Sequence, residues 1–229
     1  MKKDIRRMHA ENRTRWKTIL GVTIVISIVI LGYVIYSYHG DKRGGFSPEK
    51  RIADFTLVSN APLMEGGKIV VLFIGSEACP FCAAESWSIV TALRQYGSWS
   101  GLDHIISNSS ESIPEVPGYG FANASYHSVQ VSFWEVETTT SSWNHALQSP
   151  NSTEEALFQR FDPRGYIPFL LIGGMYLHVG SGVSPQLMAG MNWTVCSDEV
   201  SSPGEINAQV SGEASNMTAV INYLLPLIS

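Results

Sequence analysis

Residues 68–87 read KIVVLFIGSEACPFCAAESW, and this stretch decides the fold prediction. The run 68–75 is almost continuously apolar and β-branched, which is typical of a strand buried on both faces. Residues 82–97 follow with helical spacing of apolar positions and reach Gly97, a residue type that often ends helices. LDHIIS at 102–107 predicts a second buried strand. Strand, helix and strand in this order predict a parallel βαβ unit and therefore an α/β domain.

Two of the three cysteines lie where this strand should give way to the helix. Cys79 falls at or just before the first helical residue, and Pro80 occupies a first-turn position where its missing N–H costs little. The unpaired backbone N–H groups and the helix dipole are expected to stabilise a thiolate on Cys79. Cys82 joins an apolar stripe with Ile89 and Val90. We therefore expect an exposed, acidic Cys79 and a buried Cys82, the asymmetry that thiol–disulfide exchange requires.

Other uses of the cysteine pair fit the sequence less well. A zinc site needs two more ligands, and Cys196 with His178 or His104 follows no familiar zinc spacing. A structural disulfide between residues three apart closes too small a loop to stabilise much. Cys196, the odd cysteine, is a candidate for a buried free thiol, for pairing with another chain or for exchange with the pair. We expect a redox pair, with no metal and no cofactor.

The N-terminal region predicts a membrane anchor. Residues 18–38 carry no charged side chain and match the ~20 residues that a helix needs to cross a bilayer. Residues 1–17 hold seven of the fifteen Lys and Arg residues and should remain cytoplasmic. A cleaved signal peptide is the rival interpretation, but the apolar stretch is too long and no small-residue cleavage pattern follows. The linker 39–50 then leads to an extracytoplasmic domain at 51–229.

The charge of the outer domain argues against nucleic-acid binding, and glycosylation signals agree with export. From residue 41 onward the chain has eight basic and eighteen acidic side chains. This balance excludes nucleic acid as a partner, because tracking phosphates needs clustered Lys and Arg. The Asn-x-Ser/Thr acceptor pattern recurs in the outer domain at Asn108, Asn123, Asn151, Asn192 and Asn216. A glycosylated, exported domain would work where disulfides persist.

The rest of the chain predicts further elements. In chain order these are a strand at 51–58, a polar insertion at 108–150, a short helix at 151–161, a β-hairpin at 169–180, a polar excursion at 194–213 and a helix at 215–228. Residues 129–138 inside the insertion predict a strand or a strand with the start of a helix, and 184–191 favour a short helix. Ser152 or Thr153 is the expected N-cap of the helix at 151–161.

Two separated motifs resemble the thioredoxin superfamily. The first is strand–CPFC–helix at 68–96, and the second is RGYIP at 164–168 before the apolar hairpin. In that family a cis-proline begins a strand beside the active-site cysteines, and the backbone of the preceding residue pairs with the substrate. The resemblance implies that Pro168 is the cis-proline, that Ile167 contacts substrate, and that Cys79 and Cys82 are the catalytic redox pair. It covers most of residues 51–228.

The resemblance also implies an architecture, with two departures. It predicts a thioredoxin-like fold, a central mixed sheet flanked by helices, with an insertion like that of DsbA-like exported oxidoreductases. The whole plan resembles a membrane-anchored thioredoxin-like family of archaea. Many relatives carry a buried carboxylate six residues before the first cysteine, where this chain has Phe73, and a Trp where it has Ala78. A base is therefore absent or supplied elsewhere, since a solvated Glu77 would instead raise the pKa of Cys79.

These features predict a membrane-anchored, extracytoplasmic thiol–disulfide oxidoreductase. Its partners would be thiols or disulfides of exported proteins and a redox partner protein, and the direction of electron flow stays open. One alternative is a copper-handling assembly factor in which Cys79, Cys82 and His178 are soft ligands. The other is a thioredoxin-like binding module that recognises a partner through residues 108–150.

Overall fold

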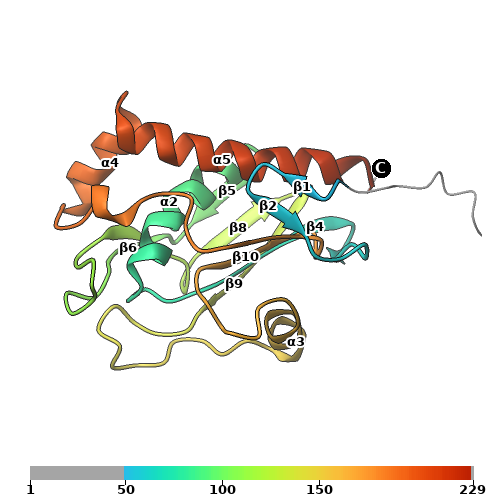
Figure 1. The fold of residues 1–229 in the computed structure, drawn as a ribbon, viewed down its shortest axis with the longest axis horizontal. Coiled ribbons are helices and arrows are strands. Elements are labelled where there is room, and N and C mark those ends of the chain that lie inside the picture. Colours follow the sequence, from blue (N-terminus) through green and yellow to red (C-terminus); the bar gives the residue numbers. More distant parts are fainter. Residues whose placement is uncertain (1–48, 228–229) are drawn as a thin grey trace, which may run out of the picture. The chain divides into compact units, whose positions relative to one another are not determined.

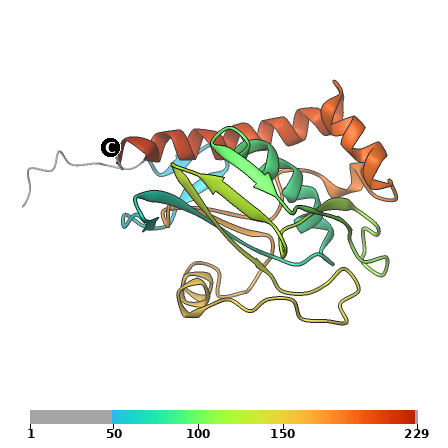
Figure 2. The same ribbon diagram turned by 180° about the vertical axis from the view of Figure 1, so that it is seen from behind.

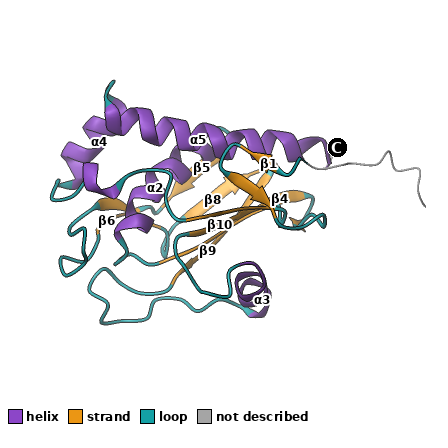
Figure 3. Ribbon diagram, in the orientation of Figure 1, coloured by secondary structure: helices purple, strands orange, loops and turns teal. Residues whose placement is uncertain are grey.

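The computed structural model describes residues 49–227. The predicted cytoplasmic tail, the predicted anchor at 18–38 and most of the linker lie outside the described residues. Within 49–227, no helix combines the length and the apolar character needed to cross a membrane. The described chain is a mixed α/β structure in which helices flank a central mixed sheet (Figure 1 and Figure 3).

Strand β4 (Lys68–Gly75) is the centre of this sheet and has the bounds that the sequence predicts. The sheet order is β1 (Arg51–Ile52), β2 (Phe55–Leu57), β11 (Tyr176–Val179), β10 (Phe169–Ile172), β4 and β3 (Met64–Glu65), with β9 (Val131–Glu137) also paired to β4. Only the β4–β9 pair is parallel among these pairings, so the sheet is mixed.

Both faces of β4 are buried, which explains its continuous apolar sequence. Alternate side chains point to opposite faces of a strand. Val71 and Phe73 enter the larger core, which includes side chains of α2 (Pro80–Leu93) and α5 (Glu205–Leu224). Leu72 enters the smaller core on the other face, where side chains of α3 (Ser152–Phe161) pack. Two opposite views show α2 and α5 on one side of the sheet and α3 on the other (Figure 1 and Figure 2).

The parallel partner of β4 differs from the prediction. Residues 103–106 do form a strand, β6 (Asp103–Ile106), but it pairs antiparallel with β7 (Pro117–Gly120) in a separate hairpin. A second small sheet joins β5 (Gly97–Ser100) and β8 (Ser125–Ser128). The chain returns to the central sheet only at β9, so the predicted insertion at 108–150 contains a core strand. The strand predicted at 129–138 is confirmed, without the start of a helix, but polar residues such as Glu135 and Glu137 concealed its place beside β4, because buried parallel strands are usually apolar.

The end of α2 and the start of α3 also differ from the predicted helix boundaries. Helix α2 ends at Leu93, and Gly97 begins β5 instead of ending the helix. The N-cap of α3 is Asn151, not Ser152 or Thr153. The Asn151 side-chain oxygen accepts hydrogen bonds from the backbone N–H groups of Thr153 and Glu154 at 2.9 and 3.1 Å. The Glu154 carboxylate accepts one from the Asn151 N–H at 2.7 Å, which completes a capping box.

The C-terminal part contains more helix than predicted. The supposed polar excursion at 194–213 holds most of α4 (Trp193–Ser201) and the first half of α5. Its many Ser, Asn and Glu residues conceal a buried face that includes Ile206 and Val210 at helical spacing. Residues 184–191 supply only the 3₁₀ turn η1 (Pro185–Leu187), and a second turn, η2 (Leu225–Leu227), follows α5. The predicted hairpin of β10 and β11 is confirmed.

The predicted first strand at 51–58 is instead a tight hairpin. Strands β1 and β2 pair antiparallel, with Ile52 opposite Phe55. Ala53 between them has φ of 51°, a left-handed conformation that non-glycine residues seldom adopt outside turns. Strand β2 then joins the edge of the central sheet through β11.

Candidate functional site

The cysteine pair lies at the junction of β4 and α2. Cys79 is the N-cap of α2 with extended backbone angles, φ −77° and ψ 123°, and Pro80 is the first helical residue. The Cys79 sulfur accepts a hydrogen bond from the backbone N–H of Cys82, with an N–S distance of 3.4 Å. A thiol thus takes the capping role that Ser, Asp or Asn usually fills. The helix N-terminus directs its free N–H groups at this sulfur, as expected from the sequence.

Both cysteines are unpaired and buried, so the predicted exposure of Cys79 is wrong. Cys79 is 7% exposed and Cys82 is 3% exposed. Two loops are hydrogen-bonded to the residues just before Cys79. The Asn108 N–H donates to the Ala78 carbonyl at 3.0 Å, and the Glu77 N–H donates to the Thr139 carbonyl at 3.1 Å. The sequence predicts that both loops belong to a polar insertion at 108–150, without indicating that they contact the cysteine loop.

The two thiols differ in acidity in the direction that the sequence predicts. A hydrogen bond from the Cys82 side chain lowers the pKa of Cys79 below its ordinary value, against the opposing effect of burial. Burial foremost, and then the hydrogen bond to Cys79, raise the pKa of Cys82 well above its ordinary value. The pair therefore holds one proton on Cys82 and favours a thiolate on Cys79, the more nucleophilic arrangement.

Glu137 is a buried carboxyl beside the thiols that sequence reasoning missed. It is 2% exposed and lies on β9 opposite Gly75 of β4, close to the start of the Cys79 loop. Its Oε1 accepts a hydrogen bond from the Phe121 N–H at 3.4 Å, and its Oε2 has no partner among the described residues. Burial foremost raises the pKa of Glu137 to about 8. Its charge in turn raises the pKa of Cys82, and the charge of Cys79 is one of the causes that raise the pKa of Glu137.

The position six residues before Cys79 is apolar, as the sequence implies. The ring of Phe73 packs edge-on against Phe121, with 5.3 Å between centroids. Glu77 is half-buried, and the expectation of a solvated side chain is wrong. Burial foremost raises the pKa of Glu77, although hydrogen bonds from Ser141 oppose this effect. Glu137, on the neighbouring strand, is a candidate for the base that Phe73 cannot provide.

The second predicted motif lies at the same end of the sheet. The Ile167–Pro168 peptide bond is cis. Pro168 directly precedes β10, and Phe169 of β10 pairs with Ile74 of β4. The loop that contains Pro168 and the loop that contains Cys79 therefore lie at the same end of the sheet. Pro168 is buried and Ile167 is half-buried, while the neighbouring Tyr166 is exposed. The register thus brings together the residues that the family resemblance singled out.

The histidine and the third cysteine do not join this site. His178 on β11 packs against the ring of Phe55, with 5.3 Å between centroids, and its ligand atoms group with Glu85 and Glu213. Within residues 49–227, no metal-like group of three or more side chains includes a cysteine. Cys196 is fully buried in the core, and burial foremost raises its pKa to about 12. The copper and zinc arrangements considered from sequence are therefore not assembled in the described chain.

His104, the other histidine considered for zinc, is also occupied elsewhere. Its ring stacks on the indole of Trp193, with 3.4 Å between centroids and 10° between planes. Trp193 begins α4, three residues before Cys196. We therefore interpret the His104 side chain as part of an aromatic packing contact with Trp193.

The five glycosylation candidates fall into two groups. Asn123, Asn151 and Asn192 are exposed. Asn108 and Asn216 are half-buried, and their amide nitrogens already donate hydrogen bonds, from Asn108 to the Ser141 carbonyl at 2.7 Å and from Asn216 to two carboxylates. Glycosylation stays a prediction, and the exposed group suits it better.

Comparison with known families adds one match. Residues 54–153 match a family model described as a domain of unknown function (DUF929). The matched segment runs from just before β2 into α3 and contains Cys79, Cys82 and Glu137, whereas Pro168 and His178 lie beyond it. The chain matches no curated protein and no solved structure.

Proposed function

We propose that this protein is a membrane-anchored, thioredoxin-like thiol–disulfide oxidoreductase whose outer domain acts on exported proteins. The observation that supports it most is the Cys79 sulfur as the N-cap of α2, bonded to the Cys82 N–H at 3.4 Å. That position gives a nucleophilic thiolate, and the opposite pKa shifts of the pair divide the roles of attack and resolution. The predicted anchor and the predicted glycosylation signals set the expected location.

In the reducing direction, the pair cleaves a substrate disulfide. The Cys79 thiolate attacks one substrate sulfur, forms a mixed disulfide and expels the other sulfur as a thiolate, which takes a proton from solvent. Cys82 then loses its proton and attacks the Cys79 sulfur. This step forms the Cys79–Cys82 disulfide and releases the second substrate sulfur, which is also protonated. Two electrons pass from the pair to the substrate, and the reverse sequence oxidises a substrate dithiol while reducing the pair.

Glu137 is the proposed proton acceptor in the second step. Cys82 has a pKa well above its ordinary value, so its attack requires removal of a proton inside the buried site. Glu137 interacts electrostatically with both thiols, and its Oε2 has no hydrogen-bond partner among the described residues. With a pKa of about 8, this carboxyl exchanges a proton readily near neutral pH. In the oxidising direction the same group returns the proton to Cys82.

The proposed substrate surface surrounds Cys79. Phe81, within the CPFC motif, is 40% exposed, and Tyr166 beside the cis-proline loop is exposed as well. Exposed aromatic side chains commonly anchor peptide partners. We assign Ile167 to main-chain pairing with the substrate by its resemblance to the thioredoxin superfamily. An extended peptide lying across Phe81 and Ile167 would present its sulfur to Cys79.

A trapping experiment tests the proposal. Cys82→Ser leaves the mixed disulfide unresolved, so partner proteins should accumulate on Cys79 in native membranes, visible by non-reducing electrophoresis and identifiable by mass spectrometry. The matched control is Cys79→Ser/Cys82→Ser, which retains Cys196 and should show no adducts. The proposal fails if Cys82→Ser yields no adducts and Cys79 of the reduced wild-type protein does not react with alkylating agents.

A further inference from the structure

Three side chains from three separate elements converge between the sheet and the helices. Glu85 belongs to α2, His178 to β11 and Glu213 to α5. Each offers one ligand atom, and these atoms all lie within 4.8 Å of one another. Glu85 is 0% exposed and Glu213 is 3% exposed, while His178 is half-buried. We refer to these three residues as the carboxylate–histidine cluster.

Each member of the cluster has a buried polar atom without a hydrogen-bond partner. These atoms are Oε1 of Glu85, Nε2 of His178 and Oε1 of Glu213. Buried polar groups are nearly always paired, because leaving one unpaired forfeits its hydration without compensation. Three such atoms in one place indicate a missing common partner.

The remaining oxygens of the two carboxylates are held in place by neighbours. Oε2 of Glu85 accepts hydrogen bonds from the Ser181 hydroxyl and the Gly182 N–H, both at 2.9 Å. Oε2 of Glu213 accepts one from the amide nitrogen of Asn216 at 3.0 Å. One oxygen of each carboxylate is thus oriented, as in metal sites whose ligands are fixed by an outer layer of hydrogen bonds.

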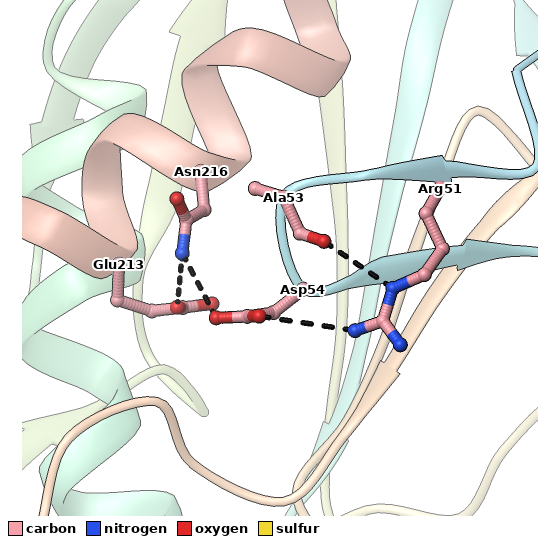
Figure 4. Close-up of polar contacts among 5 residues, drawn as sticks. All are labelled: Arg51, Ala53, Asp54, Glu213 and Asn216. Carbon is pink, nitrogen blue, oxygen red and sulfur yellow. Dashed lines mark hydrogen bonds and ion pairs between the residues drawn. The ribbon is translucent and has the colours of Figure 1, made fainter.

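Figure 4 shows how that outer layer continues to the surface. The same Asn216 nitrogen also donates to Asp54 Oδ2 at 3.2 Å, and Arg51 Nη2 lies 3.8 Å from Asp54 Oδ1. Within residues 49–227, one ion pair between a Lys or Arg and an acidic side chain reaches this region, and its acidic member is Asp54. The cluster itself has two buried carboxylates and no cationic side chain bonded to them among the described residues.

We propose that Glu85, His178 and Glu213 bind a divalent transition-metal cation, with Zn²⁺ as the best match. Two carboxylates balance the charge of the ion, and one imidazole nitrogen adds a ligand that Zn²⁺ favours. Ca²⁺ and Mg²⁺ prefer sites made of oxygen ligands alone, and Cu⁺ prefers sulfur.

The site would join α2, β11 and α5 at one point. Glu85 lies six residues after Cys79 on the same helix, so a bound ion would fix the helix that presents the proposed nucleophile. Binding of a ligand to the folded chain alone also raises the free energy of unfolding. The metal site does not depend on the redox proposal, because it shares no residue with it.

Metal binding by the full chain tests the site. A Cys79→Ser/Cys82→Ser background removes the competing thiolates, and the purified, chelator-treated protein is equilibrated with Zn²⁺ or Co²⁺. We expect one Zn²⁺ per chain, a higher thermal unfolding midpoint, and a Co²⁺ spectrum without thiolate charge transfer. Glu213→Gln should abolish this binding, and Asn216→Ala should weaken it by about 10–100-fold. Glu205→Gln, exposed on the same helix, is the matched control and should bind as the background does.

Two results would overturn the assignment. The first is a background protein that binds neither ion, which would leave a proton shared among the three side chains as the explanation. The second is metal binding that Glu213→Gln and Asn216→Ala leave unchanged, or that shows a thiolate spectrum from Cys196. Should Glu213→Gln fail to fold, the affinity of Asn216→Ala and the effect of Zn²⁺ on the unfolding midpoint of the background decide the matter.

Discussion

Helix α2 carries buried ionisable side chains in two regions, and the regions differ in what surrounds these side chains. At its N-terminus, Cys79 and Cys82 face Glu137 beside two surface loops. In its middle, Glu85 faces another carboxylate and an imidazole inside the core. Glu137 and Glu85 both have pKa values raised to about 8, chiefly by burial. The two carboxyl groups therefore have similar pKa shifts, and the side chains around each carboxyl group determine the chemistry that it can support.

In the thiol region, the two cysteine sulfurs can gain and lose electrons, and the cysteines and Glu137 can gain and lose protons. The carboxylate–histidine cluster has only atoms that can bind an ion or a proton. This difference leads to separate expectations: substitutions in the first region should remove chemistry and retain the fold, whereas changes in the second should alter ion binding and stability.

The largest effect should come from Cys79→Ser. Loss of the N-cap thiol should reduce insulin reduction by the full chain to the background rate, because the remaining thiol of the pair, Cys82, is buried and has a pKa well above its ordinary value. Cys196→Ala is the control and should keep the wild-type rate, since Cys196 is fully buried on α4. A Cys79→Ser protein with appreciable activity would show that the thiol region is wrongly assigned.

Glu137→Gln should slow the resolving step by about 10²-fold, the usual scale for losing a general base. In wild-type protein the rate of mixed-disulfide resolution should rise as pH passes upward through about 8, because Glu137 ionises there. Single-turnover measurements across pH should show this inflection, and Glu137→Gln should lack it. Glu135→Gln, half-buried two residues earlier on the same strand, is the matched control and should retain the inflection.

The same substitution should change the pH dependence of stability. The folded-state pKa of Glu137 is raised from 4.5 to about 8, so its contribution to stability is complete below about pH 4.5 and is lost as pH rises toward 8. Glu137→Gln cannot ionise and should gain stability relative to wild type over this window, by a few kcal/mol at most, given about 1.4 kcal/mol for each pKa unit. Urea unfolding at pH 5 and pH 8 measures the difference. Equal differences at both pH values would contradict the assigned shift.

The smallest effect should come from Phe81→Ala. Removing an exposed aromatic contact should raise the KM for a protein substrate by about 3–10-fold, corresponding to roughly 1 kcal/mol. The rate with a small disulfide such as oxidised glutathione should change less, because it cannot cover the Phe81 surface. Val129→Ala, at an exposed position before β9, is the control. An equal loss of activity with both substrates would indicate that Phe81 contributes to the chemical step instead of to binding of the protein substrate.

Local patterns predicted the elements whose burial is simple. The apolar run of β4, the hairpin of β10 and β11 and the helix at 151–161 could be predicted because each has a strong periodic or turn signal. The CPFC position at the strand–helix junction was predicted for the same reason. Exposure of Cys79 could not be judged, since it depends on loops whose course is set far along the chain.

Residues that depend on register or on distant packing could not be predicted. Glu137 became a site residue only when β9 paired parallel with β4, a pairing that the local pattern at 129–138 does not specify. Glu85, His178 and Glu213 lie on three elements with no local spacing that links them. The polar surface of α5 concealed the first half of the helix, which contains the buried Glu213, whereas its second half was predicted. Buried ionisable groups at functional sites are the places where composition misleads most.

The most direct test of the redox assignment is the equilibrium of the cysteine pair with glutathione. The full chain is incubated over a series of reduced-to-oxidised glutathione ratios, quenched with acid and alkylated, and the Cys79–Cys82 peptide is weighed by mass spectrometry. The account predicts one reversible two-electron transition between a dithiol and an intramolecular disulfide. Two alkylated thiols at every ratio, including fully oxidised glutathione, would contradict it.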